Sequence, residues 1–296
     1  MKRIFEYKIP SDFKDRSISD YLSFLGYSSQ NKTELKKIPE SVMLNGVWSY
    51  MTDKLKEGDT LVIKVSEEVS SSNIVPRQLP LNIVYEDEDI LVVNKSGDMP
   101  IHPSQNHYED TLANAVMHYY NAQGIPYVFR CLNRLDRETS GLTVMAKNMV
   151  SGAILSRMVM NREMHREYIA LVEGKTAESG MIDKPIGRKE GSTIERKIDY
   201  EKGEHAVTHY KRLSYDEKKN VSKLLLWLET GRTHQIRVHM GSEGHPLLGD
   251  GIYNPTNHQT ERQALHSYRL TFKHPITGKE MEFTAEVPED MRNAIL

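Results

Sequence analysis

Short apolar runs with the length and composition of β-strands recur through most of this 296-residue chain, and they constrain its fold more than any other feature. Runs of this kind, bounded by turn residues, are typical of strands. They lie at residues 42–46, 60–65, 82–86, 90–94, 142–146, 167–172, 206–212, 224–229, 267–273 and 280–286. Many strands with few, scattered helices predict an α+β fold with a mixed, largely antiparallel sheet and flanking helices.

Three segments have the spacing or capping residues of helices. Residues 17–25 place Ile18, Tyr21, Leu22 and Leu25 on one helical face. Asp110 or Thr111 can cap a second helix that continues through residue 119, and a third helix is expected over residues 150–161. Residues 82–86 and 90–94 flank an acidic turn and predict a hairpin.

A polar, serine-rich segment divides the chain. Residues 67–73 read EEVSSSN and are followed by Pro76 and Pro80, a composition typical of a connecting segment. We therefore expect a small α+β module over residues 1–72 and a larger domain over residues 79–296.

Composition favours a soluble cytoplasmic protein. No apolar stretch reaches the length of a membrane span, and Cys131 is the only cysteine, which excludes an internal disulfide and a cysteine-based zinc site. The chain has 39 basic and 41 acidic residues, but residues 130–240 hold 21 basic against 15 acidic. This local excess suits a surface that faces phosphates and equally suits an ordinary solvated face.

One carboxylate lies among cations in residues 130–142, which read RCLNRLDRETSGL. Neighbouring arginines would favour the charged form of Asp136, so that a carboxylate stands ready as a nucleophile. An exposed turn with surface ion pairs explains the same stretch equally well.

A second basic segment follows the predicted strand at residues 224–229. Residues 230–233 form a turn into an expected helix with Thr233 as its N-cap. On that helix Arg237 lies near His234 and is available to a carboxylate, although an amphipathic helix with exposed basic groups also fits. His234, His239 and His245 lack the spacing of a zinc site, and we expect them to be hydrogen-bonded or solvent-facing.

Several motifs, taken together and in order, resemble the RluA-type family of RNA pseudouridine synthases from Leu79 to Val287. They are residues 83–95 (IVYEDEDILVVNK), 102–103 (HP), 134–141 (RLDRETSG), 166–174 (REYIALVEG), 230–239 (TGRTHQIRVH), 244–250 (GHPLLGD) and 265–266 (LH). Ser96, Asn133 and Ser267 depart from the family pattern without removing a chemical group.

The resemblance implies an enzyme that isomerises specific uridines in structured rRNA or tRNA, with neither cofactor nor metal. The glycosidic bond breaks, the uracil reorients, and its 5-carbon joins the ribose. Asp136 matches the family's essential aspartate; attack on the ribose, attack on the base and assistance to elimination all stay open. Arg237 matches the residue that pairs with this aspartate, Tyr168 the aromatic that stacks on the target base, and Arg134 the arginine associated with extruding the nucleotide.

These assignments make physical sense because a base must leave the RNA stack before an enzyme reaches its glycosidic bond, at a cost of a few kcal/mol. Stacking on Tyr168 would offset roughly 1 to 3 kcal/mol of it, although a core tyrosine fits the same strand. Leu135 and Ile236 are expected to wall the pocket, or simply to pack in the core.

The first module resembles, more weakly, the αL RNA-binding domain named after a small-subunit ribosomal protein, through residues 42–46 and 57–59. The segment that matches the basic helix of this domain has few basic residues, with three lysines in residues 28–37. The expected partner is RNA, with no membrane and no obligate protein partner, and a monomer is the default.

Two alternatives remain at this point. One is a non-catalytic RNA-binding or ribosome-assembly protein on the same fold, which would have no need of Asp136, Tyr168 and Arg237 together. The other is a metal-dependent hydrolase.

Overall fold

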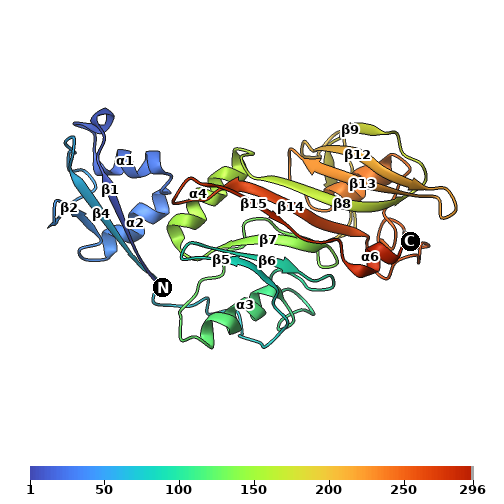
Figure 1. Ribbon diagram of the computed structural model, residues 1–296, viewed down its shortest axis with the longest axis horizontal. Coiled ribbons are helices and arrows are strands. Elements are labelled where there is room, and N and C mark those ends of the chain that lie inside the picture. The colour runs from blue at the N-terminus through green and yellow to red at the C-terminus, as the bar shows by residue number, and fades with distance from the viewer. Residues whose placement is uncertain (295–296) are drawn as a thin grey trace.

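The computed structural model describes residues 1–294 and contains a four-stranded sheet, a nine-stranded sheet and a two-stranded ribbon (Figure 1). Residues 295 and 296, the end of the expected larger domain, lie outside the described residues. Within the described part of the chain, no helix combines the length and apolar character needed to span a membrane.

The nine-stranded sheet confirms the predicted fold class, because all its neighbouring strands are antiparallel except the parallel pair β7 and β14. Its elements occupy most of the expected ranges, with ends that shift by up to four residues. In spatial order they are β5 (Ile83–Glu86), β6 (Ile90–Lys95), β7 (Ser140–Ala146), β14 (Leu265–Lys273), β8 (His165–Glu173), β13 (Val221–Leu228), β12 (Val207–Asp216) and β9 (Ser179–Asp183), with β15 (Glu280–Thr284) beside β14.

Helices cover both faces of this sheet at β6 and β7. Leu91 and Val93 pack in a core with α3 (Leu112–Asn121), whereas Ile90 and Val92 pack with α4 (Met149–Met160). Since successive strand residues point to opposite faces, a strand covered on both sides must be apolar throughout. The capping alternative for α3 is resolved in favour of Thr111, whose side chain accepts a hydrogen bond from the backbone of Asn114.

The four-stranded sheet has the order β1-β4-β2-β3 and carries two helices, α1 (Ile18–Leu25) and α2 (Ser29–Lys37). Its strands are β1 (Lys2–Lys8), β2 (Val42–Leu44), β3 (Val47–Trp48) and β4 (Thr60–Ser66), and a 3-10 turn, η1, covers Ser11–Phe13. The strand β1 is not predicted by its residue pattern, because only Phe5 of its seven residues is buried.

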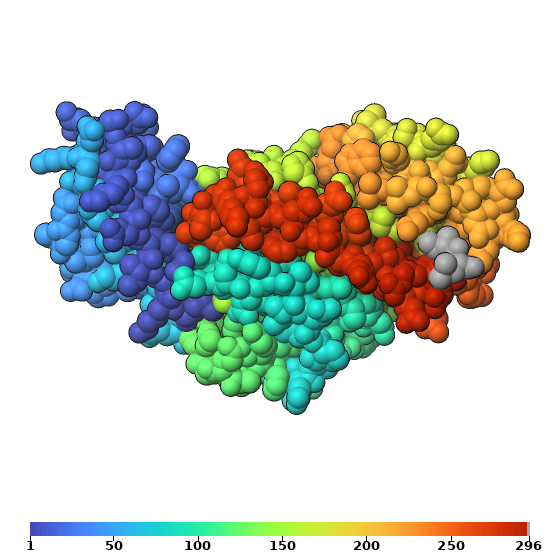
Figure 2. Space-filling model, in the orientation of Figure 1, coloured from blue at the N-terminus to red at the C-terminus, as the bar shows by residue number. Residues whose placement is uncertain are grey.

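The four-stranded sheet and its helices pack against one end of the larger sheet (Figures 1 and 2). Val150 and Ile154 of α4 belong to the apolar core of the small module. Arg3 of β1 donates two hydrogen bonds to Asp89 in the β5–β6 turn, at 3.0 and 2.7 Å. The two parts therefore share both apolar contacts and a partly buried ion pair.

Four smaller elements lie outside the two large sheets. They are the ribbon of β10 (Ile186–Arg188) and β11 (Arg196–Ile198), the helix α5 (Gln235–Ser242), and the short helix α6 (Glu289–Asn293). The helix expected after an N-cap at Thr233 is thus α5, which starts one residue later.

Gly141 allows β7 to approach β14 closely. It has φ +111°, and a Cβ there would lie 2.2 Å from the backbone oxygen of Ser267. We expect Gly141→Ala to lower the free energy of unfolding by about 2 kcal/mol or more, because neither the backbone angle nor the neighbour tolerates the methyl group. Denaturant titration measures this. Gly251→Ala is the control, since nothing lies within 4 Å of its added carbon; equal losses would contradict the explanation.

Candidate active site

Asp136 lies in the loop that leads into β7, and buried contacts fix this loop. The backbone amide of Thr139 donates to the Asp136 carbonyl at 3.1 Å, closing a turn. Gln263 donates to the Thr139 hydroxyl at 2.7 Å, and the Lys95 ammonium donates to the Arg137 carbonyl at 2.9 Å. Both Gln263 and Lys95 are buried. This loop is therefore held from two sides.

Arg237 bridges Asp136 to a second carboxylate. Its NH1 donates to Asp136 Oδ2 at 3.0 Å, while its Nε and NH2 form a two-pronged pair with Asp250 at 2.7 and 2.8 Å. The Arg237 side chain is 5% exposed and that of Asp136 28%. The interpretation as an exposed basic helix is therefore wrong for Arg237, which is buried. The turn does carry surface ion pairs, between Arg137 and both Asp98 and Glu138, but the partner of Asp136 is a buried cation.

Burial and pairing shift the pKa values of Arg237 and Asp250 in opposite directions, and the effect of pairing is the larger. Burial alone would raise the pKa of Asp250, but hydrogen bonds and charge from Arg237 hold this pKa below its usual value. The pKa of Arg237 is correspondingly raised despite its burial. Asp250 also accepts hydrogen bonds from the backbones of Ile252 and Tyr253. The guanidinium is thus held in one orientation, with NH1 directed at Asp136.

The expected N-cap at Thr233 is wrong: α5 is preceded by His234 in the left-handed conformation, with φ 57° and no side-chain cap. This strained backbone places the His234 ring against Asp136, with Nε2 3.8 Å from Oδ2, and Nδ1 2.9 Å from the Tyr253 hydroxyl. Burial, reinforced by the Arg237 charge, lowers the pKa of His234 despite the pull of Asp136. The ring is therefore neutral near pH 7.

All six residues singled out from the sequence line one recess of about 60 Å³. They are Arg134, Leu135, Asp136, Tyr168, Ile236 and Arg237. The recess lies at the edge of a larger groove of about 540 Å³, which shares Arg134, Leu135, Asp136 and Tyr168. We call this larger hollow the site groove. The fold thus brings together side chains that are up to 103 positions apart in the sequence.

Apolar and aromatic side chains form the walls around the carboxylate. Tyr168 on β8 is 5% exposed, and burial raises the pKa of its hydroxyl, which therefore stays protonated near neutral pH. Leu135 and Ile236 are also buried, at 8% and 4% exposed. Asp136 Oδ1 accepts no hydrogen bond within residues 1–294, so this oxygen is available to a ligand. An apolar wall, a phenol and a free carboxylate oxygen suit a planar base joined to a sugar.

Gln235 explains how the loop before α5 keeps its shape. Its side chain accepts from the Thr230 hydroxyl and the Arg232 backbone, and it donates to the carbonyl of Val207 and the hydroxyl of Thr208 on β12. Gln235 is buried at 3% exposed. It therefore ties the loop that carries His234 to the sheet.

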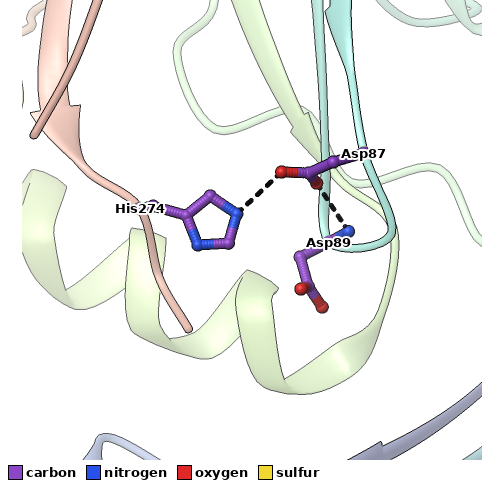
Figure 3. A group of neighbouring side chains, drawn as sticks. All are labelled: Asp87, Asp89 and His274. Atoms are coloured by element: carbon purple, nitrogen blue, oxygen red, sulfur yellow. Dashed lines mark hydrogen bonds and ion pairs between the residues drawn. The ribbon is translucent and has the colours of Figure 1, made fainter. Parts of the chain in front are cut away.

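Asp87, Asp89 and His274 form a cluster with the composition of a metal site (Figure 3), and none of them lines the recess. Its polar atoms already have protein partners. His274 accepts backbone hydrogen bonds at Nδ1 and donates through Nε2 to Asp87 at 2.9 Å, while Asp89 pairs with Arg3. This donor pattern indicates a structural link between the small module and the large sheet.

The two other histidines considered for metal binding have separate partners. His239 contacts the Thr208 hydroxyl and the Lys184 carbonyl, both at 2.9 Å, and His245 contacts the Glu173 carbonyl at 2.8 Å. The expectation of hydrogen-bonded structural histidines is confirmed for both.

Comparisons with known proteins agree with this geometry. A family model described as RNA pseudouridylate synthase matches residues 89–242. The Bacillus subtilis protein named uncharacterized RNA pseudouridine synthase YjbO is 40% identical over 281 residues, covering 94% of this chain and 98% of the relative. The chain belongs to the RNA pseudouridine synthase family.

Further relatives of this pseudouridine synthase carry more specific names. Ribosomal large subunit pseudouridine synthase D of Vibrio cholerae is 40% identical over 252 residues, covering 80% of this chain and 76% of that protein. The solved structure of human RNA pseudouridylate synthase domain containing 1 has a TM-score of 0.59 and 29% identity, covering 70% of this chain and 83% of that one. These findings confirm the RluA-type resemblance, while the RNA-binding likeness of the small module stays a prediction.

The role of Asp250 in this pseudouridine synthase was not predicted from the sequence. Asp250 ends the motif at residues 244–250, but its loop has no periodicity and its partner lies on α5. The contact between His234 and Tyr253 was likewise not predicted. Side chains that meet only in three dimensions leave no local pattern in the sequence.

We expect Asp250→Asn to lower the free energy of unfolding by roughly 3 to 5 kcal/mol near neutral pH, because it leaves the Arg237 cation poorly paired in a buried position. Since the folded-state pKa of Asp250 is depressed, its stabilisation is present above the ordinary carboxyl pKa and is lost as the pH falls through the folded-state pKa. The difference between wild type and variant should therefore shrink in acid.

Urea unfolding from neutral to acidic pH measures this difference. Glu243→Gln is the control, because the side chains of Glu243 and its partner Lys184 are 37% and 30% exposed, and such a pair should contribute no more than about 1 kcal/mol. A wild-type advantage over Asp250→Asn that grows in acid would contradict the assignment.

Proposed function

We propose that this pseudouridine synthase isomerises uridines in ribosomal RNA, with Asp136 as the catalytic carboxylate. The observation that carries the proposal is the ion pair between Asp136 and buried Arg237 at the base of a groove walled by Tyr168. Ribosomal RNA is the first substrate class to test, since several relatives are named for the large ribosomal subunit. Transfer RNA is the second.

Arg237 would hold the carboxylate in one orientation while a uridine enters. Its NH1 occupies Asp136 Oδ2, which leaves Oδ1 as the oxygen that faces the target nucleotide. A buried, pre-oriented cation acts more strongly on a neighbouring carboxylate than a mobile surface cation does. Attack by Oδ1 on the ribose, attack on the base and assistance to elimination are all compatible with this position.

Tyr168, Leu135 and Ile236 would receive the uracil ring, and Arg134 would occupy the gap left in the RNA stack. The recess of about 60 Å³ is smaller than a nucleotide, so the target must enter from the site groove, which Arg134 also lines. Stacking and apolar contacts recover part of the free energy lost when the base leaves the RNA.

A monomer in the cytoplasm would suffice for this activity. The six proposed site residues all come from one chain and line one recess. Size-exclusion chromatography with light scattering should therefore give the mass of one chain. In this scheme the chain's own residues perform the reaction, with no cofactor or metal.

Replacement of Asp136 tests the catalytic assignment. We expect Asp136→Asn to reduce pseudouridine formation by a factor on the order of 10³ or more, because the variant keeps the shape and loses the nucleophilic or basic oxygen. Chemical probing of total RNA from a deletion strain carrying each variant identifies the uridine. Asp98→Asn is the control, as its carboxylate is 80% exposed on a nearby loop.

The same strains separate the enzyme from a non-catalytic RNA-binding protein. An enzyme requires Asp136 both for the modification and for rescue of any growth defect that depends on it. Full modification by Asp136→Asn would overturn the mechanism. If the deletion strain kept all its pseudouridines and the Asp136→Ala chain rescued its growth, the non-catalytic RNA-binding protein would be favoured.

Tyr168 variants test the stacking role. We expect Tyr168→Leu to lower kcat/KM by roughly 5- to 150-fold, the equivalent of about 1 to 3 kcal/mol of base stacking. Tyr168→Phe keeps the ring, and its kcat/KM should stay close to that of the wild type. The measurement is single-turnover kinetics on the mapped RNA fragment. Equal defects in both variants would assign the contribution to the hydroxyl instead of the ring.

A further inference from the structure

A second hollow adjoins the site groove, between the β10–β11 ribbon and the loop before α5. It measures about 320 Å³ and is lined by both strands of the β10–β11 ribbon, and we call it the ribbon hollow. Gly231, Arg232 and Thr233 line both this hollow and the site groove. A polymer that enters the recess can therefore continue across this loop into the ribbon hollow.

Both hollows are rich in cationic side chains. The site groove is lined by four arginines and by only two carboxylates, one of which is Asp136: Arg134, Arg162, Arg166 and Arg232, with Asp136 and Glu229. The ribbon hollow is lined by Arg188, Arg196, Lys202 and Arg232 against a single carboxylate, Glu204. Cations gathered in two adjoining hollows attract an anionic polymer.

The ion pairs of these cations separate them into two groups. Arg162 pairs with Glu229 and Arg232 with Glu204. Among residues 1–294, the remaining cations of the two hollows form no ion pair with a described carboxylate: Arg134, Arg166, Arg188, Arg196 and Lys202. The Nε of Arg166 is moreover buried without a hydrogen-bond partner. Five of the seven cations along this path therefore form no ion pair with a described carboxylate.

Neighbouring lysines on the same ribbon show the contrast. Lys189 pairs with Glu195 at 2.5 Å and Lys197 with Asp199 at 3.7 Å, and neither lysine lines the hollow. Residues 186–204 contain five cationic and five acidic residues, so the segment as a whole is neutral. The fold, and not the local composition, places the unpaired cations in the hollow.

We propose that the ribbon hollow binds backbone phosphates of the RNA strand that continues from the target uridine, through Arg188, Arg196 and Lys202. This inference rests on the proposed function and identifies the kind of RNA the site accepts. Phosphate contacts fix the position of a strand without reading its sequence. The substrate is therefore an RNA whose target lies in an unpaired segment that extends for several nucleotides on one side.

Two charge-matched double variants test the proposal. Arg188→Gln with Arg196→Gln removes two cations of the hollow, and Lys189→Gln with Lys197→Gln removes two paired cations from the same ribbon. Each is made in the full chain, and thermal melts establish that both fold. The probe is a transcribed ribosomal RNA fragment that contains the mapped uridine, and the measurement is its dissociation constant over a series of salt concentrations.

We expect the hollow variant to bind about 10-fold more weakly near physiological salt, and its salt slope to fall by about 1.4, or about 0.7 for each lost single-strand phosphate contact. The control pair should change binding by less than 2-fold. Equal weakening by both pairs would overturn the proposal, because general charge would then explain the effect.

Shortened RNAs then locate the contact. One RNA begins at the target uridine and another ends at it, so each keeps the strand on one side only, and the hollow variant should match wild type on only one of the two. A difference that persists on both would overturn the proposal. If the chain binds RNA with the predicted contrast yet forms no pseudouridine, the proposed function fails while the binding surface stands. If it forms pseudouridine without the contrast, only the binding surface fails.

Discussion

The site depends on one guanidinium held between two carboxylates. Arg237 occupies three of its donor positions with Asp250 and Asp136, and these carboxylates come from the loops that precede the two parallel strands β14 and β7. The free energy of this arrangement comes from complete pairing, because a buried cation with one partner missing is costly. The sheet, α5 and the loop after α5 must all be in place before Asp136 has its counter-charge.

Periodicity and composition predict much of the large sheet. The β5–β6 hairpin, α3 and α4 follow from apolar runs and capping residues, because these elements bury the side chains that define the pattern. The strand β1 does not follow, since one buried residue in seven is too weak a signal and its pairing with β4 supplies the order. The domain boundaries at residues 72 and 79 stay a prediction.

The site was predictable to the extent that family motifs carry it. Asp136, Tyr168 and Arg237 have recognisable neighbours in the sequence, and the structure brings them to one recess. The burial of Arg237 was not predictable, because helical spacing alone places basic residues on a solvated face. His234 illustrates the same limit: its left-handed backbone replaces the expected cap at Thr233 and depends on the loop contacts of Gln235.

The helix α4 contributes side chains to two cores at once, with Val150 and Ile154 in the small module and Leu155 in the large sheet. Because α4 belongs to both cores, a rotation of the small module relative to the large sheet would expose apolar side chains of both parts to solvent. The span from the module to Asp136 is consequently set by the fold. If an RNA contacted both the small module and Asp136, the distance between these two contacts would be fixed. The choice of uridine would then depend on this distance as well as on the chemistry of the site.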